Sequence, residues 1–237
     1  MHLLLFILLY AAPVAIEAPA PNGVSHELWD QLLRRHVNAE GKVDYAGFKA
    51  DRATLQRYLD KLAAHPLRED WSRAEKMAYL INAYNAFTVA LVVDHYPVAS
   101  IRDIHGGNPW DVQWITLGRQ TYSLNELEHD LLRPKFQDPR IHFAVNCAAR
   151  SCPPLLNRAY TAGQLEQQLD RQTRAFINDS SYNRLREKEV EISKVFEWYR
   201  SDFGDLIDYL NRYAEIDIAP NARIRFREYD WALNKKS

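Results

Sequence analysis

The segment from Ile141 to Leu155 reads IHFAVNCAARSCPPL and holds both cysteines of the chain, Cys147 and Cys152. It also holds His142, which lies in an apolar run. A cysteine acts as a nucleophile only as the thiolate, so it needs a base or a positive field close by. The segment therefore predicts a site in which Cys147 is the nucleophile and a histidine is the base, as in a thiol-dependent hydrolase or acyltransferase.

The apolar residues from Ile141 to Asn146 are typical of a buried strand, and strand geometry separates His142 from Cys147. Five strand residues at about 3.3 Å each place the two roughly 16 Å apart, and the alternation of side chains directs them to opposite faces. We therefore expect them to meet only if the chain bends sharply near Asn146. The alternative bases are His129 and His105.

The two cysteines also suit a disulfide. A turn between them could bring their Cα atoms within the roughly 4.4–6.8 Å that a bridge needs, and an even pair is typical of secreted proteins. So short a loop gains about 2 kcal/mol in the chain-entropy model. A Cys147–Cys152 bridge would leave no resting nucleophile, and the protein would then be a non-catalytic binding or structural module.

A metal site is a third interpretation of the same cysteines, with a histidine as a further ligand. Zinc sites usually show two close cysteine pairs or a Cys2His2 set, and this chain has a single C-x4-C pair. We therefore expect neither a metal ion nor a cofactor.

The element most able to position this site is a long helix. Ser72 and Glu75 form a capping box, and the sequence KMAYLINAYNAFTVALVVDHY continues without a break to Pro97. The run is apolar nearly all round, which predicts a central, buried helix. Asn82 and Asn85 are its exceptions, and buried amides need hydrogen-bond partners. They either tie loops to the core or orient a catalytic group or a ligand, and Asn85 is the candidate for orienting a catalytic group.

A second capping box, Ser123 and Glu126, predicts a short helix that carries Glu128 and His129. Such a pair is commonly solvated on a helix surface. In a site, Glu128 could orient an imidazole, and His129 could serve as the base for Cys147.

Helical and strand patterns follow one another without regular alternation, which predicts the α+β class in a single domain. We expect it to be mostly helical around the central buried helix, with a small, mainly antiparallel sheet. The expected strands are short: residues 43–45, a hairpin that turns at Gly118-Arg119, residues 141–146, 190–192 and 224–231. A third capping box is expected at Thr161 and Gln164.

The composition and the N-terminus bear on location and partners. The chain has 30 basic and 31 acidic residues and no long run of either sign, so it lacks the charge of a nucleic-acid-binding protein. Leu3 to Ala15 is apolar and too short to span a bilayer comfortably, and small residues and prolines follow it. We expect residues 1–20 to be a signal peptide and residues 21–237 to be a periplasmic or secreted domain without a membrane span. Its partner would be a small molecule, a peptide or a protein.

Several segments together resemble the family called domain of unknown function 547. They are YLINAYNAFT, SLNELEH, IHFAVNCAARSCPPL, FEWYRSDF and YDWALN, and the resemblance covers roughly residues 26–232. It implies a largely helical domain with a small sheet, often behind a bacterial secretion signal, and no settled activity. In the family's pattern the second cysteine can be Ser, which favours Cys147 as the functional one. The family's motif positions also include His142, Asn85 and Glu128.

Overall fold

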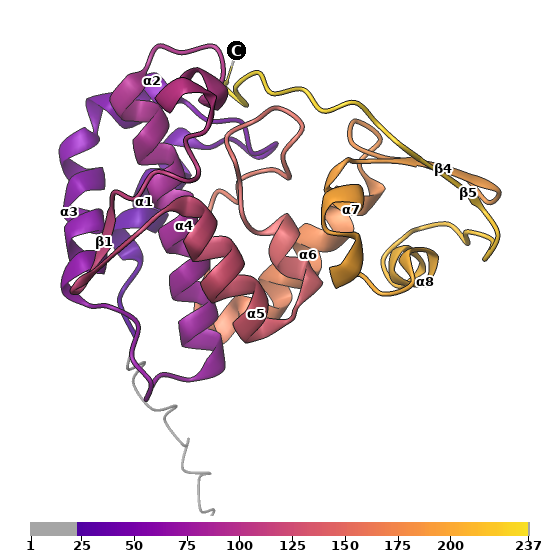
Figure 1. Ribbon diagram of the computed structural model, residues 1–237, viewed down its shortest axis with the longest axis horizontal. Helices are drawn as coiled ribbons and strands as arrows, with labels where there is room; N and C mark the ends of the chain where they lie inside the picture. The colour runs from indigo at the N-terminus through magenta and orange to yellow at the C-terminus, as the bar shows by residue number, and fades with distance from the viewer. Residues whose placement is uncertain (1–22, 237) are drawn as a thin grey trace, which may run out of the picture.

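Helix α4 (Arg73–His95) is the longest element of the computed structural model, which describes residues 23–236 (Figure 1). The predicted capping box is present, because the backbone N–H of Glu75 donates to Ser72 Oγ and the backbone N–H of Ser72 donates to Glu75 Oε2. Every residue from Met77 to Val93 is buried. The prediction of a central, buried helix is therefore confirmed.

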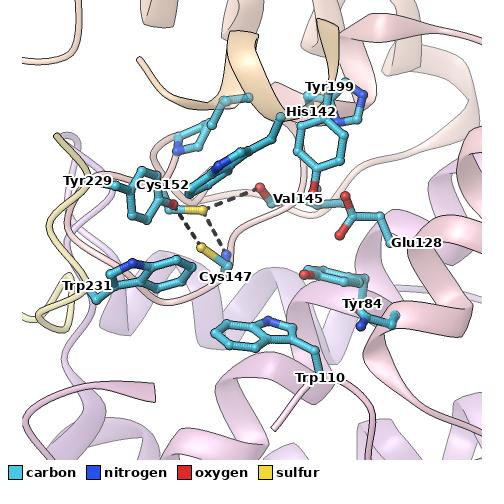
Figure 2. A pocket seen from close by; sticks show the side chains of 14 residues that line it. Tyr84, Trp110, Glu128, His142, Val145, Cys147, Cys152, Tyr199, Tyr229 and Trp231 are labelled. Carbon is cyan, nitrogen blue, oxygen red and sulfur yellow. Dashed lines mark hydrogen bonds between the residues drawn. The ribbon is translucent and has the colours of Figure 1, made fainter. Parts of the chain in front are cut away.

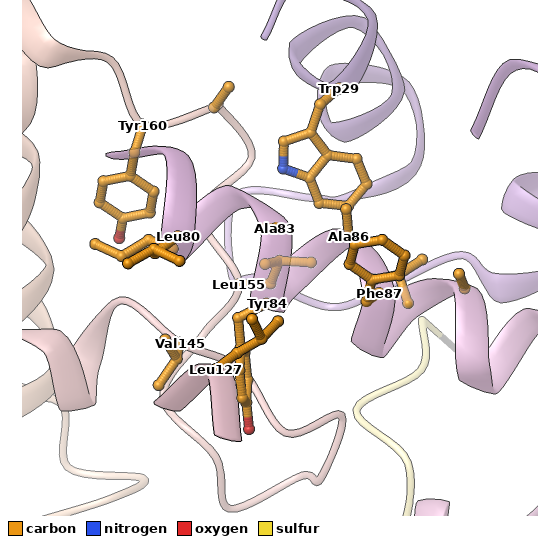
Figure 3. Close-up of a cluster of buried hydrophobic side chains, with 14 of the residues drawn as sticks. Trp29, Leu80, Ala83, Tyr84, Ala86, Phe87, Leu127, Val145, Leu155 and Tyr160 are labelled. Atoms are coloured by element: carbon orange, nitrogen blue, oxygen red, sulfur yellow. The ribbon is translucent and has the colours of Figure 1, made fainter. Parts of the chain in front are cut away.

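Three N-terminal helices pack around α4: α1 (Glu27–His36), α2 (Tyr45–Ala50) and α3 (Arg52–Ala64). Their shared core is aromatic, and the ring of Trp29 stacks on Tyr58 with centroids 5.9 Å apart. Figure 3 shows Trp29 over the α4 residues Ala83, Ala86 and Phe87. It also shows Tyr160, which comes from a later segment, beside Leu80 of α4.

After α4 the chain crosses the outside of this bundle. It forms η1 (Ile101–Asp103), η2 (His105–Gly107) and the antiparallel hairpin β1 (Ile115–Leu117) and β2 (Gln120–Tyr122). The second predicted capping box, Ser123 and Glu126, then begins η3 (Glu126–Leu132), a π-helix that continues into α5 (Arg133–Phe136). The hairpin and the short helix were both predicted, but the π-helical geometry of η3 was not.

The C-terminal part has a second core, which begins with Phe143 from η4 (Pro139–Phe143). Strands β3 (Arg184–Leu185) and β4 (Glu189–Ile192) pair antiparallel, and β4 pairs parallel with β5 (Arg223–Phe226). The helices of this part are η5 (Ala162–Gln164), α6 (Leu165–Asn178), α7 (Val195–Trp198), η6 (Arg200–Asp202) and α8 (Leu206–Asn211). The predicted α+β class is confirmed, with the strands divided between two small sheets.

Three local predictions are wrong. The strand at residues 43–45 is absent because Asp44 caps α2, accepting from the Gly47 backbone N–H at 2.8 Å. The capping box at Thr161 is absent because the Gln164 N–H donates to the Thr161 carbonyl, and the Thr161 N–H donates to Gln168 Oε1 rather than to Gln164. Residues 141–146 form no strand, since η4 ends at Phe143 and the following backbone is bonded by a side chain of α4.

The sequence predicted a signal peptide and a mature domain without a membrane span. Among residues 23–236, α4 alone is long and apolar enough to cross a membrane, and 94% of its most apolar window is buried inside the protein. The predicted signal peptide, residues 1–20, lies outside the described residues.

Candidate functional site

Cys147 lies in a pocket of about 240 Å³ between the two cores (Figure 2). Its walls come from α4, η3, η4, α7, the loop around the cysteines and the C-terminal segment. They are largely aromatic, and one carboxylate, that of Glu128, is among them. The lining residues are Tyr84, Trp110, Asn125, Glu128, His142, Val145, Cys147, Cys152, Pro153, Val195, Trp198, Tyr199, Tyr229 and Trp231.

The Cys147 thiol is partly exposed and has two close partners. Its sulfur lies 3.1 Å from the Tyr229 hydroxyl, and its backbone N–H donates to Cys152 Sγ at 2.8 Å. Cys152 is buried, and both cysteines are free thiols in the structure. The predicted proximity of the two sulfurs is therefore present, whereas the predicted disulfide is not formed.

Asn146 fixes the turn that presents Cys147. Its backbone N–H donates to Asn85 Oδ1 at 2.8 Å and its side-chain amide donates to the Pro153 carbonyl. Its Oδ1 accepts from the backbone N–H of Ala148, which has a φ of 65°. A left-handed alanine costs on the order of 1 kcal/mol or more and persists where the surroundings impose it, commonly at functional sites.

The C-terminal segment closes the other side of this turn. The backbone N–H of Arg150 donates to the Ala232 carbonyl at 2.7 Å, and that of Asn234 donates to the Ala148 carbonyl at 3.0 Å. This pairing brings Tyr229 and Trp231 over the sulfur (Figure 2).

Hydrogen bonds to the Cys147 sulfur lower the pKa of Cys147 below the ordinary value of a thiol. The hydrogen bond from Cys152 has the largest effect, and burial of Cys147 opposes it. The hydrogen bonds from Tyr229 and from the Ala149 backbone also favour the thiolate, whereas the charge of Glu128 disfavours it. Burial raises the pKa of Cys152 well above its ordinary value, so Cys147 ionises before Cys152.

Asn85 holds the backbone on both sides of this turn. Its side-chain amide donates to the Ala144 carbonyl at 2.9 Å, and its carbonyl accepts from the Asn146 N–H. Asn82 does the same one turn earlier on α4, with both backbone groups of Tyr160. Both asparagines therefore tie loops to the core, and Asn85 ties the loop that carries the nucleophile candidate.

Glu128 is 4% exposed and lies across the pocket from the sulfur, near the hydroxyls of Tyr84 and Tyr199 (Figure 2). Its Oε1 has no hydrogen-bond partner. The pKa of Tyr199 is raised by burial first and then by the negative charge of Glu128. Glu128 orients no imidazole, contrary to the role considered for it.

His142 lines the same pocket but makes no hydrogen bond to Cys147. Its Nε2 donates to Asp202 at 2.8 Å, its ring stacks on Tyr199 with centroids 3.9 Å apart, and its buried Nδ1 has no partner. The two residues do not lie on opposite faces of a strand, because that strand does not exist. Figure 2 shows them instead on opposite sides of one pocket.

The other two histidines considered as bases lie elsewhere. Arg133 donates to His129 Nδ1 at 3.0 Å, which occupies the lone pair that a base would use. His105 packs its ring against His95, 5.3 Å between centroids. No group of three or more potential metal ligands occurs in residues 23–236.

A scan of family models matches the central part of the resemblance described above. Residues 68–177 match the family described as protein of unknown function, DUF547. Searches of curated proteins and of solved structures gave no significant match. The DUF547 segment contains Asn85, Glu128, His142 and both cysteines, so the resemblance is confirmed for the part that carries them.

Other residues of the site lie beyond the DUF547 segment. Tyr229 contacts the sulfur from 82 positions downstream, and Asp202 contacts His142 from 60 positions downstream. Sequence reasoning missed both as residues of the candidate site. The segments FEWYRSDF and YDWALN, which hold Tyr199, Asp202 and Tyr229, were part of the quoted resemblance and were the available signal.

Asp202→Asn is expected to lower the free energy of unfolding by about 1–3 kcal/mol at pH 7, because the carboxylate accepts from both His142 and Arg133. The hydrogen bond from His142, followed by those from Arg133, holds the pKa of Asp202 well below its usual value. The stabilisation is therefore fully present above the unfolded pKa of about 4 and is lost as the pH falls below it.

Urea unfolding of the wild type and of Asp202→Asn at pH 7 and near pH 3 measures this difference. The gap between them should shrink at the lower pH. Asp208→Asn, an exposed carboxylate on α8, is the control and should change little. A gap that is constant or grows in acid would contradict the account of Asp202.

Proposed function

We propose that the protein is a thiol-dependent hydrolase or acyltransferase with Cys147 as its nucleophile. The observation that carries this proposal is the Tyr229 hydroxyl, which lies 3.1 Å from the Cys147 sulfur. The side chains of Cys152 and Tyr229 favour a thiolate on Cys147, and Cys147 is partly exposed at a pocket large enough for a small acyl group. A low thiol pKa at an accessible site is what distinguishes a reactive cysteine from a structural one.

In this reaction the Cys147 thiolate attacks the carbonyl carbon of a bound ester or amide, and the carbonyl π electrons move to oxygen. The collapse of the tetrahedral intermediate expels the leaving group, which takes a proton, and an acyl thioester remains on Cys147. The Tyr229 hydroxyl is a proton donor 3.1 Å from the sulfur. It gives its proton to the leaving group and takes one back from the water or acceptor that cleaves the thioester. Tyr229 thus replaces the histidine expected from the sequence.

Alkylation followed by intact mass tests the nucleophile. With limiting iodoacetamide at pH 7, we expect one fast adduct, located on Cys147 by peptide mapping. Cys152 should be labelled much more slowly, because it is buried and its pKa is raised. Cys147→Ser is the control and should lose the fast adduct. Fast labelling of Cys152, or none at either thiol in the reduced protein, would contradict the proposal.

A second candidate function is a redox module that forms a Cys147–Cys152 disulfide reversibly. The short contact between the Cys147 N–H and Cys152 Sγ favours it, because little movement is needed to join the sulfurs. With an added low-molecular-weight disulfide, the Cys147 thiolate would form a mixed disulfide, and Cys152 would displace the second thiol. Intact mass separates the candidates: the loss of two hydrogens after the added disulfide, restored by mild reductant, supports the redox module, and a protein that keeps both thiols free opposes it.

Export and partner are also proposals. The apolar run at residues 3–15 supports cleavage of residues 1–20 and a periplasmic or secreted location. The pocket supports a small molecule, or a side chain of a peptide or protein, as the partner. The mass of the protein recovered from a periplasmic fraction checks the cleavage, and a full-length mass there would count against it.

A further inference from the structure

Glu128 is a carboxylate without a complete set of partners inside an aromatic pocket. It is 4% exposed; its carboxylate accepts from the Tyr199 hydroxyl, but its Oε1 has no hydrogen-bond partner. A buried ionised carboxylate is costly unless it is paired, and a buried acceptor left unmade costs on the order of 1–3 kcal/mol. A group that persists at such a cost, in a cavity that opens to ligands, points to a ligand that completes it.

Within residues 23–236, no Lys or Arg forms an ion pair with Glu128. Arg133 feels its charge, and its guanidinium lies 4.9 Å from the centre of the Tyr199 ring. Its Nε and Nη2 already donate to Asp202, at 2.8 and 2.9 Å, and its Nη1 donates to His129. Among the described residues, the pocket lining contains no Lys or Arg, and His142 is held by the same Asp202.

The remaining walls suit a cation. Trp198 and Trp231 stack with centroids 5.9 Å apart, and Trp110 meets Trp231 edge to face at 5.5 Å. Figure 2 shows Trp110 and Trp231 with Tyr84 and Tyr229 around the cavity that Glu128 enters from one side. The faces of tryptophan and tyrosine rings attract ammonium groups, and the attraction is stronger where water is excluded.

We propose that this pocket binds the ammonium group of a substrate, paired with Glu128 and enclosed by the tryptophans and tyrosines. The inference rests on the proposed function and names its substrate class: an acyl compound, or an acyl acceptor, that carries a primary or methylated amine. The cavity of about 240 Å³ has room for a short alkylammonium chain beside Cys147. An anionic group in the same place would be repelled by the Glu128 carboxylate and be excluded.

Quenching of tryptophan fluorescence in a titration with n-butylammonium tests the proposal, because three tryptophans line the pocket. 1-Butanol and butyrate are the neutral and anionic probes of similar size. We expect the ammonium to bind roughly tenfold or more tighter than the alcohol, and butyrate weakest. Equal affinities for ammonium and alcohol in the wild type would overturn the proposal without any variant.

Glu128→Gln removes the charge and keeps the shape of the side chain. It should weaken butylammonium binding roughly tenfold or more and leave the affinity for 1-butanol unchanged. Asp130→Asn is the matched control, because Asp130 lies two residues away on η3, is exposed and does not line the pocket. Unchanged ammonium binding in Glu128→Gln, or an equal loss in Asp130→Asn, would overturn the proposal.

The same titration in Cys147→Ser separates this inference from the proposed function, since the ammonium contact does not need the sulfur. Retained binding there, together with slow alkylation of wild-type Cys147, would support the ammonium site and contradict the nucleophile. Fast alkylation of Cys147 together with equal binding of butylammonium and 1-butanol would support the nucleophile and contradict the ammonium site.

Discussion

Asn85→Ala is expected to lower the free energy of unfolding by about 2–5 kcal/mol and to slow the alkylation of Cys147. The substitution leaves two buried backbone groups unbonded, the Ala144 carbonyl and the Asn146 N–H, at roughly 1–3 kcal/mol each. Asn146 also holds the turn at Ala148, so its displacement moves the thiol away from its partners. Urea unfolding and the alkylation rate under native conditions measure the two effects.

Asn82→Ala is the matched control, because Asn82 makes the same pair of buried bonds with the backbone of Tyr160. It should cost a similar free energy of unfolding and leave the alkylation rate of Cys147 nearly unchanged. If both variants slow alkylation equally, reactivity follows global stability, and Asn85 has no positioning role of its own.

Cys152→Ala is expected to raise the pKa of Cys147 and to slow its alkylation at pH 7. The hydrogen bond from Cys152 has the largest effect in lowering the pKa of Cys147, and alanine cannot donate. Each pKa unit above the working pH reduces the thiolate fraction about tenfold. At pH 10, where the thiol of either protein is ionised, the two rates should converge.

The pH dependence separates this electrostatic effect from a steric one. Tyr229→Phe should act in the same direction, because it removes the second hydrogen bond to the sulfur. If Cys152→Ala reacts as fast as the wild type at pH 7, or remains slower by the same factor at pH 10, Cys152 does not control the ionisation of Cys147.

Local patterns predicted the elements that depend on neighbours in the sequence. The capping boxes at Ser72 and Ser123 formed, because each needs only residues three positions apart. The apolar run of α4 is long and unbroken, so its helix could be predicted without knowing which residues pack on it. The strand predicted at residues 141–146 failed because its backbone bonds are made by Asn85, about 60 positions earlier, and no pattern within the segment encodes that partner.

For the site, too, only the features that depend on residues close in the sequence could be predicted. The cysteine-rich segment pointed to Cys147, and the α4 asparagines pointed to its support. The alternation of side chains along a strand was the reason given for separating His142 from Cys147. That reason was wrong, because residues 141–146 form no strand. Tyr229 could not be found this way, because it reaches the sulfur through pairing of the C-terminal segment with residues 148–150.

The rate of Cys147 alkylation as a function of pH tests the central claim most directly. The wild-type profile should show one titration with a midpoint below the ordinary thiol value of about 8.5, because Cys152 and Tyr229 stabilise the thiolate. Cys147→Ser should abolish that phase. A midpoint at or above 8.5, with the rate set by exposure alone, would show that Cys147 is an ordinary thiol and would contradict the account.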